Sequence, residues 1–228
     1  MALTIYFDFD GPIIDVSVRY HRLHSDLTSQ MGFRTLPFDT YWEMKRQRMP
    51  IDRILPNCTE AERRAYTAKR LDLIETSEYL AYDRIHPWAK EVLTLMGRDH
   101  RLILVTLRNS RKGLIQQIER LGIKGHFEQV LSKDNNHGDW RVKRELILSY
   151  PPIQCPAVMV GDTEGDILAG RDLRFYTVGV LSGIRTREYL ESLGADRIIL
   201  DIRSLPDILQ VEVSCPETQA GECLTRKN

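Results

Sequence analysis

Residues 4–15, TIYFDFDGPIID, set the strongest limit on the fold, because an apolar run there leads directly into two carboxylates. The run is β-branched and aromatic and ends near a Gly-Pro turn signal, so it predicts a buried strand over residues 5–7. Asp8 and Asp10 follow that strand, and alternation along extended backbone would point both to the same side. Because Gly11 lets the backbone turn away, the two charges are expected to lie close together at one edge of a sheet.

Two neighbouring carboxylates repel each other, and this repulsion disfavours their simultaneous ionisation. The pair therefore indicates either a site for a hard metal ion, which prefers oxygen ligands, or two groups that share a proton. A solvated turn capped by two aspartates is the explanation without a function. The stretch alone leaves these three interpretations open.

Composition narrows the classes of protein to consider. The 228 residues suit one domain, or a core domain with a modest insertion. Lys plus Arg and Asp plus Glu both number 32, so no basic excess indicates a nucleic-acid or membrane partner. No apolar run approaches the roughly 20 residues of a membrane span, and Met1 leads into a strand rather than a signal sequence. We expect a cytoplasmic protein whose cysteines, without metal-type spacing, are reduced.

Residues 16–85 differ in character, since they contain no convincing strand and are dense in helix formers and charge. Apolar residues at helical spacing predict helices over about 16–31 and about 40–48. Thr59 followed by Glu62 is a capping box that starts a third helix. We therefore expect residues 16–85 to form a small helical domain inserted into the chain.

The rest of the chain alternates apolar strands with helices, which is typical of a doubly wound parallel sheet in an α/β fold. The expected strands are 102–105, 130–131, 157–160, 176–180 and 197–200. The expected helices are one ending at Gly97 and those over about 110–121, 140–149 and 186–193. The core domain would comprise residues 1–15 and 86–210, and residues 211–228 would form a flexible tail.

Polar residues follow two of these strands, at the edge where ligands bind in parallel sheets. Thr106 follows the strand 102–105, and Lys143 lies in the first turns of the helix expected over 140–149. Asp162 and Asp166 follow the strand 157–160 in the pattern Gly-Asp-x-x-x-Asp. Each of these residues, taken alone, has an ordinary explanation as a turn or surface residue.

Taken in order, these residues resemble the four motifs of the haloacid dehalogenase superfamily. The motifs are Asp8-x-Asp10-Gly11-x-x-x-Asp15, then Thr106, then Lys143 with Lys133 as its rival, and finally Gly161-Asp162-x-x-x-Asp166. The resemblance covers about residues 1–209 and is strongest to the phosphoglycolate phosphatase-like branch. The helical insertion is matched by its position between the first two motifs rather than by motifs of its own. It implies a Rossmann-like core with a helical cap that closes over the site.

The resemblance further implies a Mg²⁺-dependent phosphatase that hydrolyses a small phosphate monoester through an aspartyl-phosphate. Asp8 would be the nucleophile, and Asp10 would protonate the leaving oxygen and then deprotonate the hydrolytic water. Thr106 and Lys143 would offset the phosphate charge. The metal ligands would be Asp8, the backbone carbonyl of Asp10, Asp162 and, more distantly, Asp166. Substrate contacts are expected from basic and amide residues, although a solvated face is the simpler explanation of each: Arg108, Asn109, Arg19, Arg22, Lys45, Arg46 and Arg48.

Two other functions fit the same motifs. A phosphomutase would transfer the phosphoryl group to a sugar hydroxyl instead of water, and a non-catalytic module would only bind a phosphate ligand. Asp10 argues against a dehalogenase, which needs no acid for a halide leaving group. Pro12, Val16 and the absence of a proline after Lys143 depart from the common pattern. Because of these departures, the resemblance does not identify the substrate. The sequence does not determine the oligomeric state either.

Overall fold

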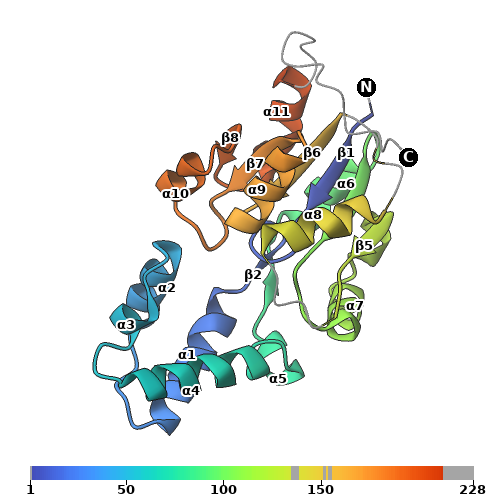
Figure 1. Cartoon of the computed structure of the whole chain (residues 1–228). Coiled ribbons are helices and arrows are strands. Elements are labelled where there is room, and N and C mark those ends of the chain that lie inside the picture. The colour runs from blue at the N-terminus through green and yellow to red at the C-terminus, as the bar shows by residue number, and fades with distance from the viewer. Residues whose placement is uncertain (1, 135–138, 151–152, 154–155, 213–228) are drawn as a thin grey trace.

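A six-stranded parallel sheet forms the centre of the protein (Figure 1). The computed structural model describes residues 2–134, 139–150, 153 and 156–212. The strands lie in the spatial order β5 (Gln129–Leu131), β4 (Arg101–Val105), β1 (Thr4–Phe7), β6 (Ala157–Gly161), β7 (Tyr176–Val180) and β8 (Arg197–Ile199). Phe7 pairs with Leu104 on one side and Val160 on the other, so three motif-bearing strands end together. The predicted α/β fold is confirmed.

Helices cover both faces of this sheet because its central strands are apolar on both sides. Ile5 and Phe7 face a core shared with α6 (Ala89–Met96), α7 (Arg111–Arg120) and α11 (Leu205–Glu212). Tyr6 points to the opposite core, on the side of α8 (Trp140–Leu148) and α9 (Glu164–Asp172). A short helix, α10 (Arg187–Ser192), connects β7 to β8. The sheet therefore places its loops, rather than its strands, where a ligand can reach them.

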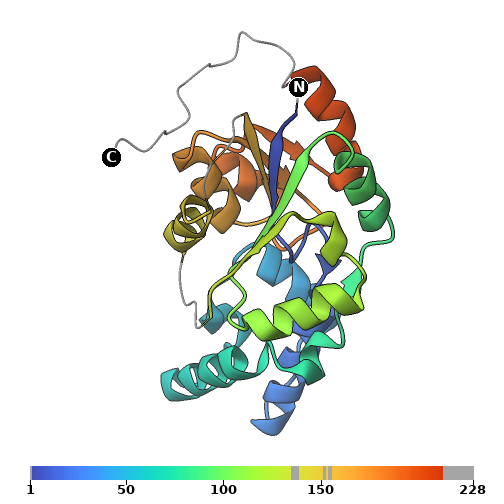
Figure 2. The same ribbon diagram turned by 90° about the vertical axis from the view of Figure 1, so that its right-hand side faces the viewer.

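Five helices between the first two motifs form what we call the helical insertion. They are α1 (Ser17–Gln30), α2 (Phe38–Arg46), α3 (Ile51–Ile54), α4 (Glu60–Leu73) and α5 (Ser77–Leu80). The insertion has its own apolar core, which includes Leu23, Leu27, Tyr41 and Tyr66. The two views in Figures 1 and 2 place it beyond the carboxyl ends of the strands. It therefore lies over the edge of the sheet that carries the motifs.

The capping box at the start of α4 is confirmed. Glu62 accepts a hydrogen bond from the Thr59 amide at 2.7 Å, and Thr59 Oγ1 accepts one from the Glu62 amide at 3.3 Å. The expectation that residues 16–85 contain no strand is wrong for the last two residues of that range. Strand β3 (Arg84–Ile85) pairs antiparallel with β2 (Ile14–Asp15), and together they form the neck of the insertion. Two-residue strands are too short to show a periodic pattern.

Helices α3, α5, α9 and α11 and the turns 124–126 and 202–204 were not predicted either. They are short or follow no clear apolar period. Of the expected tail, residues 211 and 212 belong to α11, and residues 213–228 lie outside the described residues. Within the described ranges, no helix has the length and apolar character needed to cross a bilayer.

Candidate active site

Asp8 lies immediately beyond β1, at the centre of the sheet, and is 7% exposed. Its Oδ1 is 3.1 Å from Lys143 Nζ. Burial and repulsion from Asp166 raise the pKa of Asp8 to about 7, although Lys143 opposes the shift. The protein therefore stabilises the charged form of Asp8 less well than water does.

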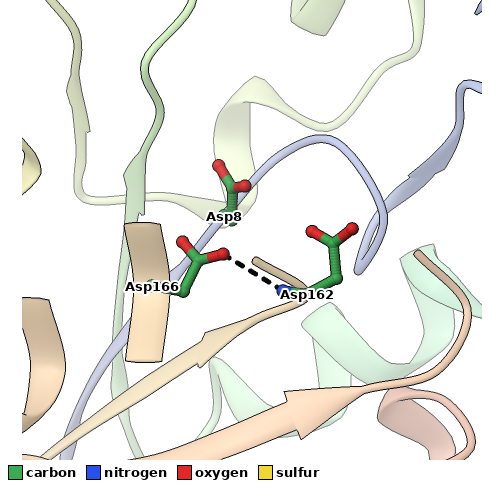
Figure 3. Close-up of side chains that lie close together, drawn as sticks. All are labelled: Asp8, Asp162 and Asp166. Carbon is green, nitrogen blue, oxygen red and sulfur yellow. Dashed lines mark hydrogen bonds between the residues drawn. The ribbon is translucent and has the colours of Figure 1, made fainter. Parts of the chain in front are cut away.

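Asp162 and Asp166 reach the same point from the end of β6 and the start of α9, as Figure 3 shows. Asp166 is fully buried, and its Oδ2 accepts hydrogen bonds from the amides of Asp162 at 3.1 Å and Thr163 at 2.9 Å. It also accepts one from the Thr163 hydroxyl at 2.7 Å. Asp166 is thus held rigidly, and it fixes the loop that presents Asp162.

Lys143, rather than Lys133, joins this cluster. It projects from the first turn of α8, is 1% exposed and forms an ion pair with Asp166 as well as with Asp8. Burial alone would lower the pKa of Lys143, but the carboxylates of Asp166 and Asp8 raise it above its usual value. Lys143 is therefore a fixed positive charge beside Asp8, whereas Lys133 is exposed.

The three carboxylates suit a divalent cation bound through oxygen. Asp8, Asp162 and Asp166 each offer an oxygen within 4.8 Å of the others. Asp162 Oδ1 is buried and has no hydrogen-bond partner among the described residues. Burial and the neighbouring charges of Asp166 and Asp8 raise the pKa of Asp162 well above its usual range. Because Lys143 pairs with only two of these three carboxylates, a hard cation would relieve the remaining repulsion.

Two glycines make room for the Asp162 carboxylate. A Cβ atom added to Gly11 or to Gly183 would collide with the side chain of Asp162. Gly11 also has a φ of +95°, which side-chain-bearing residues rarely adopt. The glycine of the first motif is therefore required both for the turn after Asp10 and for the approach of the β6 loop.

Asp10 has partners of its own. Arg108 binds it through two guanidinium nitrogens, with Nη2 2.6 Å from Oδ1 and Nε 3.0 Å from Oδ2, and Arg19 Nη2 lies 2.7 Å from Oδ2. Burial alone would raise the pKa of Asp10, but Arg108 and Arg19 lower it to about 2. Because Asp8 and Asp10 have separate cationic partners, the structure argues against a proton shared between them.

Asp83, just before β3, holds the two arginines together and was missed by the sequence analysis. Its side chain is fully buried, with Oδ1 3.2 Å from Arg19 Nε and Oδ2 3.2 Å from Arg108 Nη2. Gln117 on α7 donates a further hydrogen bond to Oδ2 at 2.7 Å. Nothing in the local sequence distinguishes this aspartate from its acidic neighbours, because its partners are brought to it only by the fold.

The loop after β4 carries Thr106 and Asn109. Thr106 is 3% exposed and follows the strand next to β1, so it lies on the same edge of the sheet as Asp8. The amide of Asn109 donates to both carboxylate oxygens of Glu75 at 3.0 and 2.9 Å, and the Ser110 amide donates to Oε2 at 3.1 Å. Glu75, another residue missed from the sequence, thereby connects the insertion to the start of α7.

The five basic residues predicted in the insertion have different environments. Arg22 is exposed and paired with Asp26 at 3.1 Å, away from the carboxylate cluster. Arg46 donates to the carbonyls of Leu181 and Gly183, and Arg48 is paired with Glu164 at 3.3 Å. These bonds hold α2 and the residues after it against the loop after β7 and the start of α9. Arg19 binds Asp10, as described above. Lys45 also faces the core, and it has no carboxylate within 4.0 Å among the described residues.

Comparison with known sequences places these residues in a known context. Residues 5–180 match the sequence model of a family described as haloacid dehalogenase-like hydrolase. The chain is 25% identical over 225 residues to the pyrophosphatase PpaX of Halalkalibacterium halodurans, a match covering 91% of this chain and 95% of that protein. It is also 25% identical over 223 residues to a phosphoglycolate phosphatase of Psychrobacter arcticus, covering 90% and 94%.

Solved structures show the same fold. A haloacid dehalogenase-like family hydrolase from Streptococcus pneumoniae superposes with a TM-score of 0.72 at 16% sequence identity. That match covers 92% of this chain and 99% of the other, so the helical insertion is part of the shared architecture.

Proposed function

Because this chain belongs to the haloacid dehalogenase-like hydrolase family, we propose that it is a Mg²⁺-dependent phosphatase that hydrolyses a small phosphate monoester through an aspartyl-phosphate. Its relatives include a pyrophosphatase and a phosphoglycolate phosphatase, and the chain is accordingly a hydrolase acting on phosphate esters. The observation that carries the proposal is the buried contact of Asp8 with Lys143, beside Asp162 and Asp166.

Asp8 is the proposed nucleophile, because it is the carboxylate at the end of the central strand that faces a fixed ammonium. Its oxygen would form a bond to phosphorus while the bond to the leaving oxygen breaks, giving an aspartyl-phosphate that water then hydrolyses. Lys143 and the Thr106 hydroxyl would bind the non-reacting phosphoryl oxygens and fix the in-line approach.

Asp10 would protonate the leaving oxygen and then deprotonate the attacking water. Its carboxylate form, held by Arg19 and Arg108, suits the second of these roles directly. Protonation of the leaving oxygen requires a state of the site in which Asp10 has gained a proton. Arg108 lies on the same loop as Thr106 and binds Asp10 directly, so its assignment as a substrate-binding residue stays a prediction from the sequence.

Asp8, the backbone carbonyl of Asp10 and Asp162 would hold the metal, and Asp166 would act behind them because its oxygens are engaged by Lys143 and the loop amides. When bound, Mg²⁺ would reduce the repulsion between the nucleophile and the phosphate dianion. The oxygen-only donor set favours Mg²⁺ over softer metals.

We further propose that residues 1–15 and 86–210 act as the catalytic core and that residues 16–85 act as a cap. Contacts at two places support this division: Arg46 reaches the loop after β7, and Glu75 reaches the loop after β4. Cytoplasmic location and the absence of nucleic-acid and membrane partners stay predictions from composition.

Release of inorganic phosphate from a panel of sugar phosphates, phosphoglycolate, pyrophosphate and nucleotides tests the proposal. Turnover that requires added Mg²⁺ is expected with at least one of these substrates. Conversion of a sugar phosphate to its positional isomer without free phosphate would instead identify a mutase. Metal-dependent binding of a phosphate analogue without turnover of any substrate would identify a binding module.

A further inference from the structure

Three cations surround one aromatic ring on the face of the insertion that meets the core. The ring centroid of Tyr20 lies 5.5 Å from the guanidinium carbon of Arg19, 5.9 Å from Lys45 Nζ and 5.1 Å from the guanidinium carbon of Arg70. The residues come from α1, α2 and α4, so the fold of the insertion brings them together. We call Tyr20, Lys45 and Arg70 the cationic cluster.

Only one of the three cations is neutralised. Arg19 is paired with Asp10 and Asp83. Lys45 and Arg70 have no carboxylate within 4.0 Å in the parts of the chain that the structure describes. Elsewhere in the insertion exposed arginines do have acidic partners, as Arg64 does at 3.0 Å. The cationic cluster is therefore a local excess of positive charge, not a general property of these helices.

This excess is unfavourable in the absence of an anion. Burial, together with repulsion from Arg70 and Arg185, lowers the pKa of Lys45 to about 7. The neighbouring Tyr41 hydroxyl brings no negative charge to offset them. Cation–π contact with Tyr20 offsets part of the desolvation, and a bound anion would offset the remainder.

The cationic cluster adjoins the catalytic residues. Arg185 Nη1 donates to the carbonyl of Lys45 at 3.2 Å and pairs with Glu164 at 3.0 Å, two residues from Asp162. On the other side, Arg19 joins Tyr20 to Asp10. Arg185 and Arg19 therefore connect the cationic cluster to the residues beside Asp162 and to Asp10.

We propose that Lys45 and Arg70, held over the Tyr20 ring, form a subsite for a second anionic group of the substrate, either a carboxylate or a phosphoryl group on its leaving portion. The inference rests on the proposed phosphatase activity and narrows its substrates to phosphate esters or anhydrides with a charged leaving group. A planar guanidinium and a mobile ammonium would bind such a group by charge-assisted hydrogen bonds. Arg70 was not among the substrate contacts that the sequence predicts.

Steady-state kinetics with paired substrates test this subsite. The variants Lys45→Gln and Arg70→Gln are compared with Lys69→Gln, which changes an exposed neighbour on α4. On phosphoglycolate and pyrophosphate we expect each subsite variant to lose at least about tenfold in kcat/KM, the loss of one charge-assisted bond. The leaving group of p-nitrophenyl phosphate has no carboxylate or phosphoryl group for the subsite to bind. On this substrate, kcat/KM of both variants is therefore expected to stay within about twofold of the wild-type value. A loss confined to phosphoglycolate or to pyrophosphate would identify the carboxylate or the phosphoryl group, respectively.

Binding separates this proposal from the proposed activity. Asp8→Asn protein with Mg²⁺ is titrated calorimetrically with phosphoglycolate and with methyl phosphate, and tighter binding of phosphoglycolate that is lost on adding Arg70→Gln supports the subsite even without turnover. Equal affinity for the two ligands, or equal kinetic losses on every substrate, would overturn the subsite and leave the phosphatase assignment standing.

Discussion

At the scale of single residues, Asp8 and Asp10 show how strongly local partners govern a carboxylate. The two are one residue apart, yet burial and Asp166 raise the pKa of Asp8 to about 7, whereas Arg108 and Arg19 lower that of Asp10 to about 2 against the effect of burial. A difference in environment of this kind separates the roles of paired carboxylates in enzymes. The proposal assigns the two residues different parts accordingly: a bound cation would stabilise the charged form of Asp8, and Asp10 would exchange a proton with water.

The raised pKa of Asp8 predicts how metal-free protein responds to pH. Asp8 binds its proton more tightly in the folded than in the unfolded chain, so its contribution to stability is full below about pH 4 and is lost as pH rises to about 7. In chelator, urea unfolding should give a free energy that falls by about 2–3 kcal/mol more between pH 5 and pH 8 in wild type than in Asp8→Asn. If the free energy of unfolding depended equally on pH in both proteins, burial and Asp166 would not destabilise the charged form of Asp8.

Asp162 provides the corresponding prediction for the metal. Asp162→Ala removes a buried ligand oxygen, so the rise in melting temperature on adding Mg²⁺ should disappear and kcat/KM should fall by at least about 100-fold. Asp39→Ala, at an exposed position on α2, is the matched control and should behave as wild type. Undiminished activity of wild-type protein in excess chelator would remove the metal from the mechanism.

At the scale of elements, a buried ion-pair network connects the loop of Asp10 to the neck of the insertion. Arg19 on α1 and Arg108 after β4 both contact Asp10 and Asp83, and Gln117 on α7 anchors Asp83. Three parts of the chain that are distant in sequence, residues 10–19, residue 83 and residues 108–117, therefore share one network. Any movement of the insertion about β2 and β3 must displace Asp83 relative to Asp10.

Asp83→Asn tests this network. It leaves two buried arginines with one carboxylate fewer, so we expect a loss of about 3 kcal/mol in unfolding free energy. We also expect a fall in kcat that exceeds any change in KM, because Arg108 would no longer hold Asp10 in place. Asp72→Asn, an exposed change at the end of α4, supplies the baseline. If Asp83→Asn were as stable and as active as Asp72→Asn, the network would contribute neither to stability nor to catalysis.

His24 gives the insertion a pH dependence of its own. It is fully buried, stacks on Tyr41 with ring centroids 4.3 Å apart, and its Nδ1 lies 2.9 Å from the Tyr66 hydroxyl. Burial, with repulsion from His21, Lys45 and Arg70, lowers the pKa of His24 to about 4, so its stabilisation is present above pH 6.5 and is lost as pH falls towards 4.

The matched measurement uses His24→Gln, which cannot titrate. Wild type should lose about 2 kcal/mol more than this variant between pH 7 and pH 5 in chemical unfolding. His24 thus lowers the free energy of unfolding as pH falls, whereas Asp8 lowers it as pH rises. Identical losses in both proteins would mean that His24 is accessible to protonation in the folded state.

At the scale of the whole molecule, the sequence predicted what depends on local pattern. Apolar runs ending in Asp8, Thr106 and Asp162 predicted parallel strands, and parallel strands necessarily present these residues at one edge. The family resemblance favoured Lys143 over Lys133, because Lys143 lies at the start of a helix that leads to the last motif, and the structure places Lys143 against Asp8. These assignments needed no knowledge of how distant segments pack.

The residues that were missed depend on such packing. Asp83 and Glu75 lie in the insertion but act on the loops of Asp10 and Asn109, and Arg70 acts through a ring on another helix. No periodicity or motif marks these residues, because a charged side chain in a turn or on a helix is explained equally well by exposure to solvent. The short strands of the neck were missed for the related reason that two residues cannot show alternation.

The proposed mechanism requires that Asp8 become phosphorylated during turnover. Asp10→Asn protein should hydrolyse that intermediate slowly, because no carboxylate activates the water. Acid quenching during turnover of a substrate with a good leaving group, followed by peptide mass spectrometry, should therefore find one phosphoryl group on Asp8, and none in protein that also carries Asp8→Asn. Steady phosphate release by the doubly substituted protein, at the rate of Asp10→Asn alone and without any phosphorylated peptide, would contradict the account.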